Sequence, residues 1–165
     1  MIIRSETRAD IASIRSLTEA AFHGAEHSSG TEGAIIDALR QAGALSISLV
    51  AEQDGTIIGH VAFSPVLIGG EDLGWFGLGP VSVSRMFQRR GIGVALIKEG
   101  LRLLKDRGTA GCVVLGDPKY YRRFGFTSNH ALRYGEIPAE YFQSIAWSDE
   151  LAKGEVTYHE GFGAS

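Results

Sequence analysis

Three arginines and two glycines lie close together in the middle of the chain, between an apolar segment and an amphipathic one. Arg85, Arg89 and Arg90 precede or adjoin Gly91 and Gly93. The first amides of a helix have no intrahelical partner and carry partial positive charge, so an anion is stabilised there. Glycine lets phosphate oxygens approach the backbone closely, and a planar guanidinium group pairs well with phosphate. The pattern predicts a site for a pyrophosphate group, and so for a nucleotide-bearing cofactor.

A dinucleotide-binding Rossmann fingerprint is an alternative explanation of the two glycines. That fingerprint needs a third Gly or Ala three residues after Gly93, where this chain has Leu96. It also places its glycines almost directly after a strand, with no basic loop between them. Close packing of a helix on a strand would explain Gly93, but it would not explain the three arginines beside it. We therefore favour the phosphate site.

Composition indicates an ordinary folded chain. It has 165 residues, of which 44% are hydrophobic and 21% charged, and its formal net charge is −3. Such a chain can bury a sizeable core within one domain, and the negative charge disfavours nucleic acid as a partner. Cys112 is the single cysteine and lies in an apolar run, which predicts a buried thiol in a reducing compartment. No stretch approaches the ~20 apolar residues of a membrane helix, so we expect a cytoplasmic protein with no membrane partner.

Hydrophobic periodicity predicts the elements that must position the basic loop. An antiparallel meander should come first, followed by a strand–helix–strand unit around the loop and an irregular segment before a last strand. The expected strands are 2–3, 45–51, 56–64 (ended by Pro65), 73–83, 112–115 and 154–162. The expected helices are 11–22, 31–43, 91–107 and 118–123, and the irregular, aromatic segment is 127–153. Together these predict one mixed α/β domain.

Two motifs resemble those of the GNAT superfamily of N-acetyltransferases. Residues 88–93, Gln-Arg-Arg-Gly-Ile-Gly, match the family signature of Gln or Arg, two residues, Gly, one residue, and Gly or Ala. Residues 121–126, Tyr-Arg-Arg-Phe-Gly-Phe, match Tyr-x-x-x-Gly-Phe after the fifth strand. The order of elements agrees from Ile2 to about Phe162, so the resemblance covers nearly the whole chain.

The resemblance implies one N-acetyltransferase domain over residues 1–165. Its fold would be a twisted mixed sheet of about seven strands with flanking helices, splayed at the fourth and fifth strands. The implied donor is acetyl-coenzyme A, whose pantetheine arm would pair with strand backbone and whose pyrophosphate would meet the amides of the loop. The implied cofactor-binding residues are Val81, Ser82 and Val83 in the strand, and Gln88, Arg89, Arg90, Gly91, Ile92, Gly93 and Val94 in the loop and helix start.

Tyr121 is the implied catalytic residue, because the family often uses this tyrosine to protonate the departing sulfur. A phenol with a pKa of about 10 stays protonated at neutral pH and can donate to a thiolate whose parent thiol has a pKa of about 8.5. Tyr120 is the alternative acid if the helix is displaced by one residue. The family also often has an asparagine seven residues earlier, where this chain has Val114. A side-chain contact to the pantetheine is therefore not expected at that position.

No residue is assigned as the general base. An amine with a pKa near ~10.4 is largely protonated at neutral pH, which places its reactive form about 4.6 kcal/mol above the protonated one. Glutamate midway along the fourth strand relieves this in some family members, but the segment 73–83 contains no acid. Other ionisable residues remain as alternatives with more common surface or structural roles: Glu26, His27, Glu32, His60, Glu71 and Asp72.

The acceptor is predicted only by class. A small primary amine is favoured, with segments 23–33 and 127–153 expected to recognise it. The alternatives are an enzyme acting on a protein or aminoacyl-tRNA amine, and a non-catalytic regulator that binds acyl-coenzyme A. Five aromatic residues could line an acceptor pocket or equally belong to the core: Trp75, Tyr134, Tyr141, Phe142 and Trp147. No metal-ligand spacing is present, and a homodimer is an open alternative.

Overall fold

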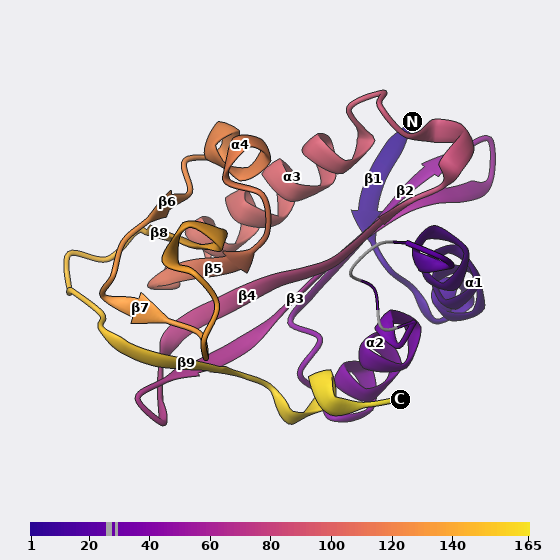
Figure 1. Ribbon diagram of the computed structural model, residues 1–165. Helices are drawn as coiled ribbons and strands as arrows, with labels where there is room; N and C mark the ends of the chain where they lie inside the picture. Colours follow the sequence, from indigo (N-terminus) through magenta and orange to yellow (C-terminus); the bar gives the residue numbers. More distant parts are fainter. Residues whose placement is uncertain (26–27, 29) are drawn as a thin grey trace. The chain divides into compact units, whose positions relative to one another are not determined.

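The computed structural model describes residues 1–25, 28 and 30–165, and Figure 1 shows how its helices and strands follow the chain. The strands are β1 (Ile2–Ser5), β2 (Ile47–Gln53), β3 (Thr56–Ile68), β4 (Glu71–Val83), β5 (Gly111–Leu115), β6 (Thr127–Ser128), β7 (Leu132–Arg133), β8 (Phe142–Ala146) and β9 (Gly154–Tyr158). The α-helices are α1 (Ile11–Phe22), α2 (Glu32–Gln41), α3 (Ile92–Asp106) and α4 (Pro118–Tyr121). Short 3-10 helices are η1 (Arg8–Asp10), η2 (Arg85–Phe87), η3 (Arg122–Phe124), η4 (Ala139–Tyr141) and η5 (Glu160–Gly163).

Within the described residues, nine strands form a mixed sheet in the order β1-β2-β3-β4-β5-β8-β6, with β9 beside β3 and β7 beside β9. The pairs β1–β2 and β2–β3 are antiparallel, as the predicted meander requires. β4 and β5 are parallel and pair from Trp75↔Gly111 to Gly77↔Val113, and α3 connects them. The α/β class and the strand–helix–strand unit are confirmed. The count is higher than the expected seven strands because it includes β6 and β7, which have only two residues each. The predicted splay between the fourth and fifth strands stays a prediction.

The prediction that Pro65 ends its strand is wrong, because β3 continues to Ile68. Proline cannot donate a ladder hydrogen bond and is tolerated where its amide needs no partner. β3 pairs with β2 as far as Phe63 and with β9 from Val66 onward. Pro65 therefore lies between the part of β3 that pairs with β2 and the part that pairs with β9. Its missing N–H removes no hydrogen bond from either pairing.

The prediction of an irregular segment over 127–153 is only partly right. β8 lies inside it and pairs antiparallel with all of β5, from Gly111↔Ala146 to Leu115↔Phe142. Gln143 and Ser144 of this strand are both buried, so polar residues occupy interior positions and obscure the strand in the sequence. The last strand also ends earlier than expected, at Tyr158, and η5 follows it.

The chain divides into two compact units, which are described separately. The first consists of Met1–Phe63, Gly79–Gly100 and Glu160–Ser165, and the second of Ser64–Leu78 and Leu101–His159. In the described part of the chain, no helix combines the length and apolarity needed to cross a membrane.

Helices cover both faces of the strands in the first unit. Val50 packs with Ile14 of α1 and Ile36 of α2 on one face. On the other face, a Cβ added at Gly100 of α3 would lie 2.1 Å from the Phe63 ring. Only glycine fits at this position because the helix backbone rests directly on an aromatic ring. Both strand faces are therefore buried, which accounts for the nearly continuous apolar run of β2 and β3.

The second unit has its own apolar core. Buried side chains from six strands meet there: Val66, Ile68, Trp75, Val113, Leu132, Phe142 and Val156. The ring of Tyr158 lies over Gly77, where an added Cβ would be 2.4 Å from Cε1. Cys112 is fully buried, and the predicted buried thiol is confirmed. Burial strongly raises the pKa of that thiol, which keeps it protonated.

A chain of polar side chains crosses the first unit beneath α2. Arg40 donates to Glu6 through Nε at 2.9 Å and through Nη2 at 3.0 Å. Ser48 donates to Glu6, and the Ser48 Oγ lies 2.7 Å from Nε2 of His60. Burial is the main cause that lowers the pKa of His60 to about 4, with a smaller opposing effect of Glu6. His60 is therefore neutral in the folded protein at physiological pH.

The buried imidazole should make stability depend on pH. An unfolded histidine has a pKa of about 6.5, so lowering the pH below that value protonates the unfolded chain first and favours unfolding. We expect the wild-type free energy of unfolding to fall by about 3 kcal/mol more than that of His60→Gln between pH 6.5 and pH 4. Urea unfolding at several pH values measures both slopes. Parallel slopes would contradict a neutral buried His60.

Candidate functional site

The end of β4 presents one backbone edge that β3 does not use. The Ser84 amide donates to the Ile58 carbonyl at 2.8 Å, so the antiparallel ladder directs Ser82 and Ser84 backbone groups toward β3. Hydrogen-bonding direction alternates along a strand, and the backbone groups of Val81 and Val83 therefore point to the opposite edge. These residues also lie beyond the segment that pairs with β5. An extended ligand could pair with this edge as an added strand does.

The loop after β4 leads into a helix whose N-cap residue is a glycine and so has no side chain to cap the first amides. The Ala95 amide donates to the Gly91 carbonyl at 3.0 Å, which makes Gly91 the N-cap of α3. The amides of Gly91, Ile92, Gly93 and Val94 therefore lack intrahelical acceptors. Gly91 has φ +81°, and a Cβ added there would meet no atom within 4 Å. Arg89 also has positive φ, at 65°, and successive amides around such residues form an anion-binding concavity.

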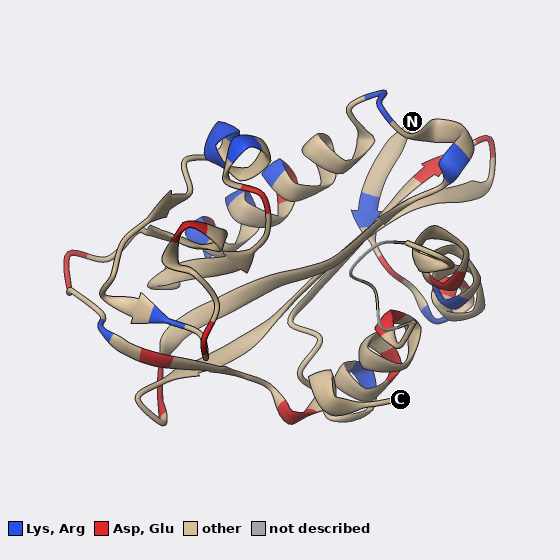
Figure 2. Cartoon of the chain, in the orientation of Figure 1, with Lys and Arg blue, Asp and Glu red and all other residues tan. Residues whose placement is uncertain are grey.

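Side-chain contacts hold this basic loop in shape. Arg85 donates to the His23 carbonyl at 2.5 Å, and Gln88 Nε2 donates to the Val83 carbonyl at 3.2 Å. The Arg90 guanidinium lies 5.4 Å from the centre of the Phe87 ring. The arginines appear as blue ribbon segments before α3 in Figure 2. Arg85 is thus directed toward the end of α1, whereas Arg89 and Arg90 directly precede Gly91 and α3, so the predicted grouping of all three arginines around the phosphate site stays a prediction.

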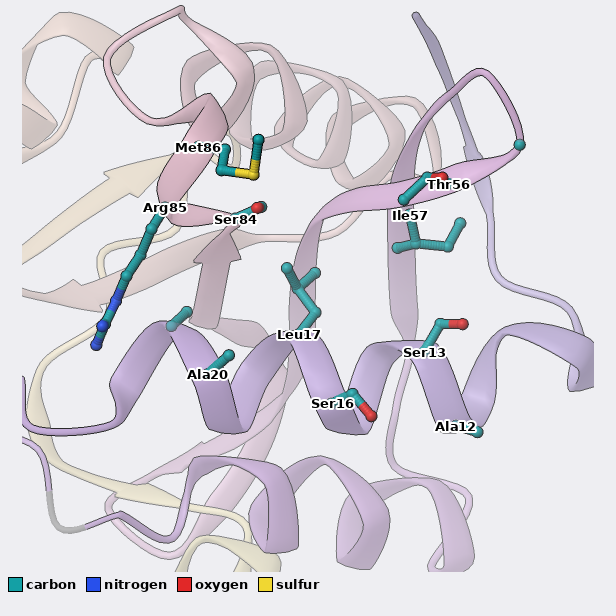
Figure 3. Close-up of a pocket in the computed structure, with 12 residues that line it drawn as sticks. Ala12, Ser13, Ser16, Leu17, Ala20, Thr56, Ile57, Ser84, Arg85 and Met86 are labelled. Atoms are coloured by element: carbon teal, nitrogen blue, oxygen red, sulfur yellow. The ribbon is translucent and has the colours of Figure 1, made fainter.

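A cavity of about 670 Å³ lies beside the start of this loop, within the first unit. Figure 3 shows α1 forming one wall, with Leu17 and Ser13 directed toward Ile57 and the Ser84–Met86 segment. Apart from Leu17, the wall from α1 consists of small and hydroxyl side chains, whereas Arg85 supplies the one charged group among the described lining residues. The volume is that of a small-molecule site.

Tyr121 lies in the second unit at the end of α4. Asp117 caps this helix by accepting from the Lys119 amide at 2.9 Å, and Pro118 takes the first-turn position. The Tyr121 ring packs edge-on against Phe126, with centroids 6.0 Å apart. A Cβ added at Gly116 would lie 2.4 Å from Cε2 of this ring. The tyrosine is thus held by its neighbours rather than extended into solvent.

Burial raises the pKa of Tyr121 to about 12, with smaller contributions from Tyr120 and Cys112. Such a phenol is fully protonated at neutral pH and can act only as a proton donor. Tyr120 is also partly buried, and burial raises its pKa as well. It differs in its contacts, since the Arg123 guanidinium lies 4.4 Å from the centre of its ring.

Several sequence candidates have structural roles. Val114 is buried at 1% exposure, so its position offers no polar side chain. Glu32 accepts from Ser28 Oγ at 2.9 Å, and Glu71 and Asp72 are exposed at the start of β4. Glu26 and His27 lie outside the described residues. Among the residues described, no group of three or more His, Cys, Asp or Glu could hold a metal ion.

The aromatic candidates are mainly core residues. Trp75 and Phe142 are buried in the second unit, and Tyr134 stacks on Phe142 with centroids 5.6 Å apart. Tyr134 and Phe142 also line a smaller cavity of about 250 Å³ formed by residues 130–142.

Comparison with known proteins identifies the family that this fold and loop define. The family model described as an acetyltransferase (GNAT) domain matches residues 2–128. The chain belongs to the GNAT acetyltransferase family.

Individual relatives resemble nearly the whole chain. The N-acetyltransferase YhbS of Escherichia coli K12 is 39% identical, with 98% of each chain covered. The crystal structure of a GNAT family acetyltransferase from Brucella melitensis in complex with acetyl-CoA has 52% identity and a TM-score of 0.88, covering 98% of this chain and 97% of that one. The structure of Escherichia coli YhbS in complex with CoA has 38% identity and a TM-score of 0.89, covering 98% of this chain and 91% of that one.

Sequence patterns missed the cavity wall of α1. Four exposed residues of the helix form it together with Leu17 and Ala21: Ala12, Ser13, Ser16 and Ala20. Their common feature is the lack of charge on one face, whereas Arg15 and Glu19 of the same helix are charged. The sequence also gives no indication that Gly116 makes room for Tyr121, since the two residues meet only through the turn into α4.

Proposed function

We propose that this chain transfers the acetyl group of acetyl-coenzyme A to the amine of a small molecule, by direct attack in a ternary complex, with residues 1–165 acting as one catalytic domain. The observation that carries the proposal is the glycine N-cap of α3, which follows in sequence the β4 edge that β3 does not use. Relatives whose structures contain acetyl-CoA or CoA support the choice of donor.

The residues present fit this cofactor. The amides from Arg89 to Val94 would hold the pyrophosphate, because an anion satisfies helix-terminal N–H groups that have no other partner. The open space at Gly91 leaves room for phosphate oxygens. Val81 and Val83 would pair with the pantetheine arm on either side of Ser82. When bound, acetyl-coenzyme A supplies a thioester that is already activated for attack.

Tyr121 would act as the acid, and the amide of Val81 or Val83 would polarise the carbonyl oxygen by donating a hydrogen bond. A phenol with a pKa of about 12 is a weaker acid than the ordinary tyrosine. Burial also raises the pKa of the neighbouring Cys112 thiol. A thiolate formed in similar surroundings would be correspondingly more basic, so the proton would still transfer to sulfur.

The α1 cavity supports a small acceptor. Its volume of about 670 Å³ suits a metabolite-sized amine, and the described lining offers hydroxyl groups and Arg85 but no carboxylate. A polycationic amine would find no countercharge among the described lining residues. An acceptor that carries an anionic or hydroxyl group besides its amine would match this lining better.

Acetyl-coenzyme A should raise the melting temperature of the wild type by mass action. Gly91→Glu should abolish this shift, because it places bulk and negative charge where the phosphates would bind. A thermal shift series with coenzyme A and acetyl-coenzyme A measures both. Gly163→Glu is a control at another open glycine outside the site, and it should keep the shift. A wild type unaffected by millimolar ligand would disprove the cofactor assignment.

Tyr121→Phe should lower kcat by about a hundredfold while leaving the Kd for coenzyme A nearly unchanged, since general acids typically contribute 10²–10⁴-fold. The matched control is Tyr120→Phe, which removes a neighbouring phenol and should retain most of the turnover. Free-thiol release with saturating amine gives kcat, and calorimetry gives the Kd. If Tyr120→Phe is the impaired variant, the acid is Tyr120 instead.

An amine panel distinguishes the classes of acceptor. We expect thiol release with small primary amines, highest for those that also carry a carboxylate or phosphate, and a specific loss of that preference in Arg85→Gln. A protein-directed enzyme would release thiol only with peptides, and an aminoacyl-tRNA enzyme only with its charged tRNA. A non-catalytic regulator would bind the cofactor and release none.

A further inference from the structure

Three buried side-chain atoms in the described part of the chain have no hydrogen-bond partner: His60 Nδ1, Ser64 Oγ and Ser82 Oγ. His60 is 0% exposed and Ser82 is 2% exposed. Leaving a polar group unpaired in such surroundings is unfavourable, because its lost hydrogen bonds to water are not replaced. His60 lies on β3, and Ser82 lies between the two residues of β4 proposed to meet the cofactor.

The hydrogen-bond chain behind His60 determines which ring nitrogen carries the proton. Glu6 is paired with Arg40 and its pKa is lowered, so it is a carboxylate that only accepts. Ser48 must therefore donate its one hydroxyl proton to Glu6. Its oxygen is left to accept from His60 Nε2–H at 2.7 Å. Nδ1 of the neutral ring is consequently a bare acceptor.

Strand pairing predicts that this acceptor lies opposite Ser82. The Ser84 amide bonds to the Ile58 carbonyl, next to an irregularity in the pairing of β3 with β2. A regular antiparallel ladder continued two residues from that bond would make His60 and Ser82 a facing pair. Facing residues project from the same side of the sheet. His60 pairs with Val50 across β2, and Val50 packs against α1 and α2, so this side is the covered one.

We propose that His60 and Ser82 hold one buried water between them, and that this bridge positions the Val81 and Val83 backbone for acetyl-coenzyme A. The water would donate to Nδ1 and hydrogen-bond with the Ser82 hydroxyl, which satisfies both unpaired atoms. A bridge of this kind is nearly as favourable as a direct hydrogen bond. The proposal rests on the proposed function, since it assigns His60 and Ser82 as positioning residues for that cofactor.

The bridge would act through the peptide planes of β4. Ser82 shares a peptide group with each neighbouring valine, so fixing its side chain restricts rotation of the planes whose polar groups point to the outer edge. At the other end of this series of hydrogen bonds, Arg40 of α2 donates to Glu6, which follows β1. A continuous polar link would then run from α2 across β2 and β3 to β4.

Two substitutions of His60 test its bond to the proposed water and its bond to Ser48 separately. Asparagine can place an oxygen near the position of Nδ1 and keep the acceptor, but it cannot reach Ser48. Glutamine can place an amide near the position of Nε2 and keep the bond to Ser48, but it loses the acceptor that faces Ser82. Ser82→Ala removes the other end of the bridge, and Ser64→Ala is the matched control at a buried, unpaired serine on β3.

Calorimetry with coenzyme A and steady-state kinetics are the tests. Ser82→Ala and His60→Gln should raise the Kd and the KM for acetyl-coenzyme A about three- to tenfold, as the loss of one hydrogen bond would, with kcat changed by less than about twofold. His60→Asn and Ser64→Ala should stay within about twofold of the wild type. Equal losses in His60→Asn and His60→Gln, or an unchanged Kd in Ser82→Ala, would overturn the proposal.

Nitrogen NMR of the imidazole tests the bridge without the cofactor. At pH 7 the wild type should show protonated Nε2 and bare Nδ1, and Ser82→Ala should shift the Nδ1 resonance while Ser64→Ala leaves it in place. A protonated Nδ1, or a resonance insensitive to Ser82→Ala, would refute the bridge. A wild type that shows these resonances but binds no coenzyme A would refute the proposed function alone.

Discussion

The strict alternation of backbone hydrogen bonds along β4 is the constraint on which the candidate site depends. The bond from the Ser84 amide to the Ile58 carbonyl shows that the backbone N–H and C=O groups of Ser82 and Ser84 point toward β3. The neighbouring valines must then point their N–H and C=O groups the other way. A regular ladder would also place Ser82 opposite His60 on the covered face. An outward edge for a ligand and the proposed inward bridge between Ser82 and His60 would thus both follow from a single ladder.

Helix α3 adds the second requirement, a set of amides left without acceptors. Most helices satisfy these groups with a serine, threonine, aspartate or asparagine at the N-cap. Here the N-cap is Gly91, which has no side chain to donate or accept. Arg89 and Gly91 both have positive φ and turn the loop tightly before the helix begins. Gly91 thus stabilises the start of α3 less than a capping side chain would, and for the same reason it leaves the first amides available to an anion.

Much of this arrangement could be predicted from residue patterns. The Gln-Arg-Arg-Gly-Ile-Gly run located the loop and the start of α3 because glycine and arginine have few alternative explanations at that spacing. β8 was hidden because Gln143 and Ser144 are polar yet buried, and their contacts come from strands distant in sequence. The continuation of β3 through Pro65 depends on a change of strand partner, which no local pattern encodes. The role of His60 could not be inferred either, since Ser48 and Glu6 meet it only after three strands have paired.

Helix α1 separates two properties that often conflict. Ile14 lies on its buried side and supports the core, whereas Ala12, Ser13, Ser16 and Ala20 are exposed along the cavity. Residues of the second kind can be exchanged for larger or charged ones with little loss of packing. If the cavity receives the acceptor as proposed, selection could retune substrate preference on one helix face while the other face preserves the fold. Divergence among relatives would then accumulate along α1 sooner than in the loop that precedes α3.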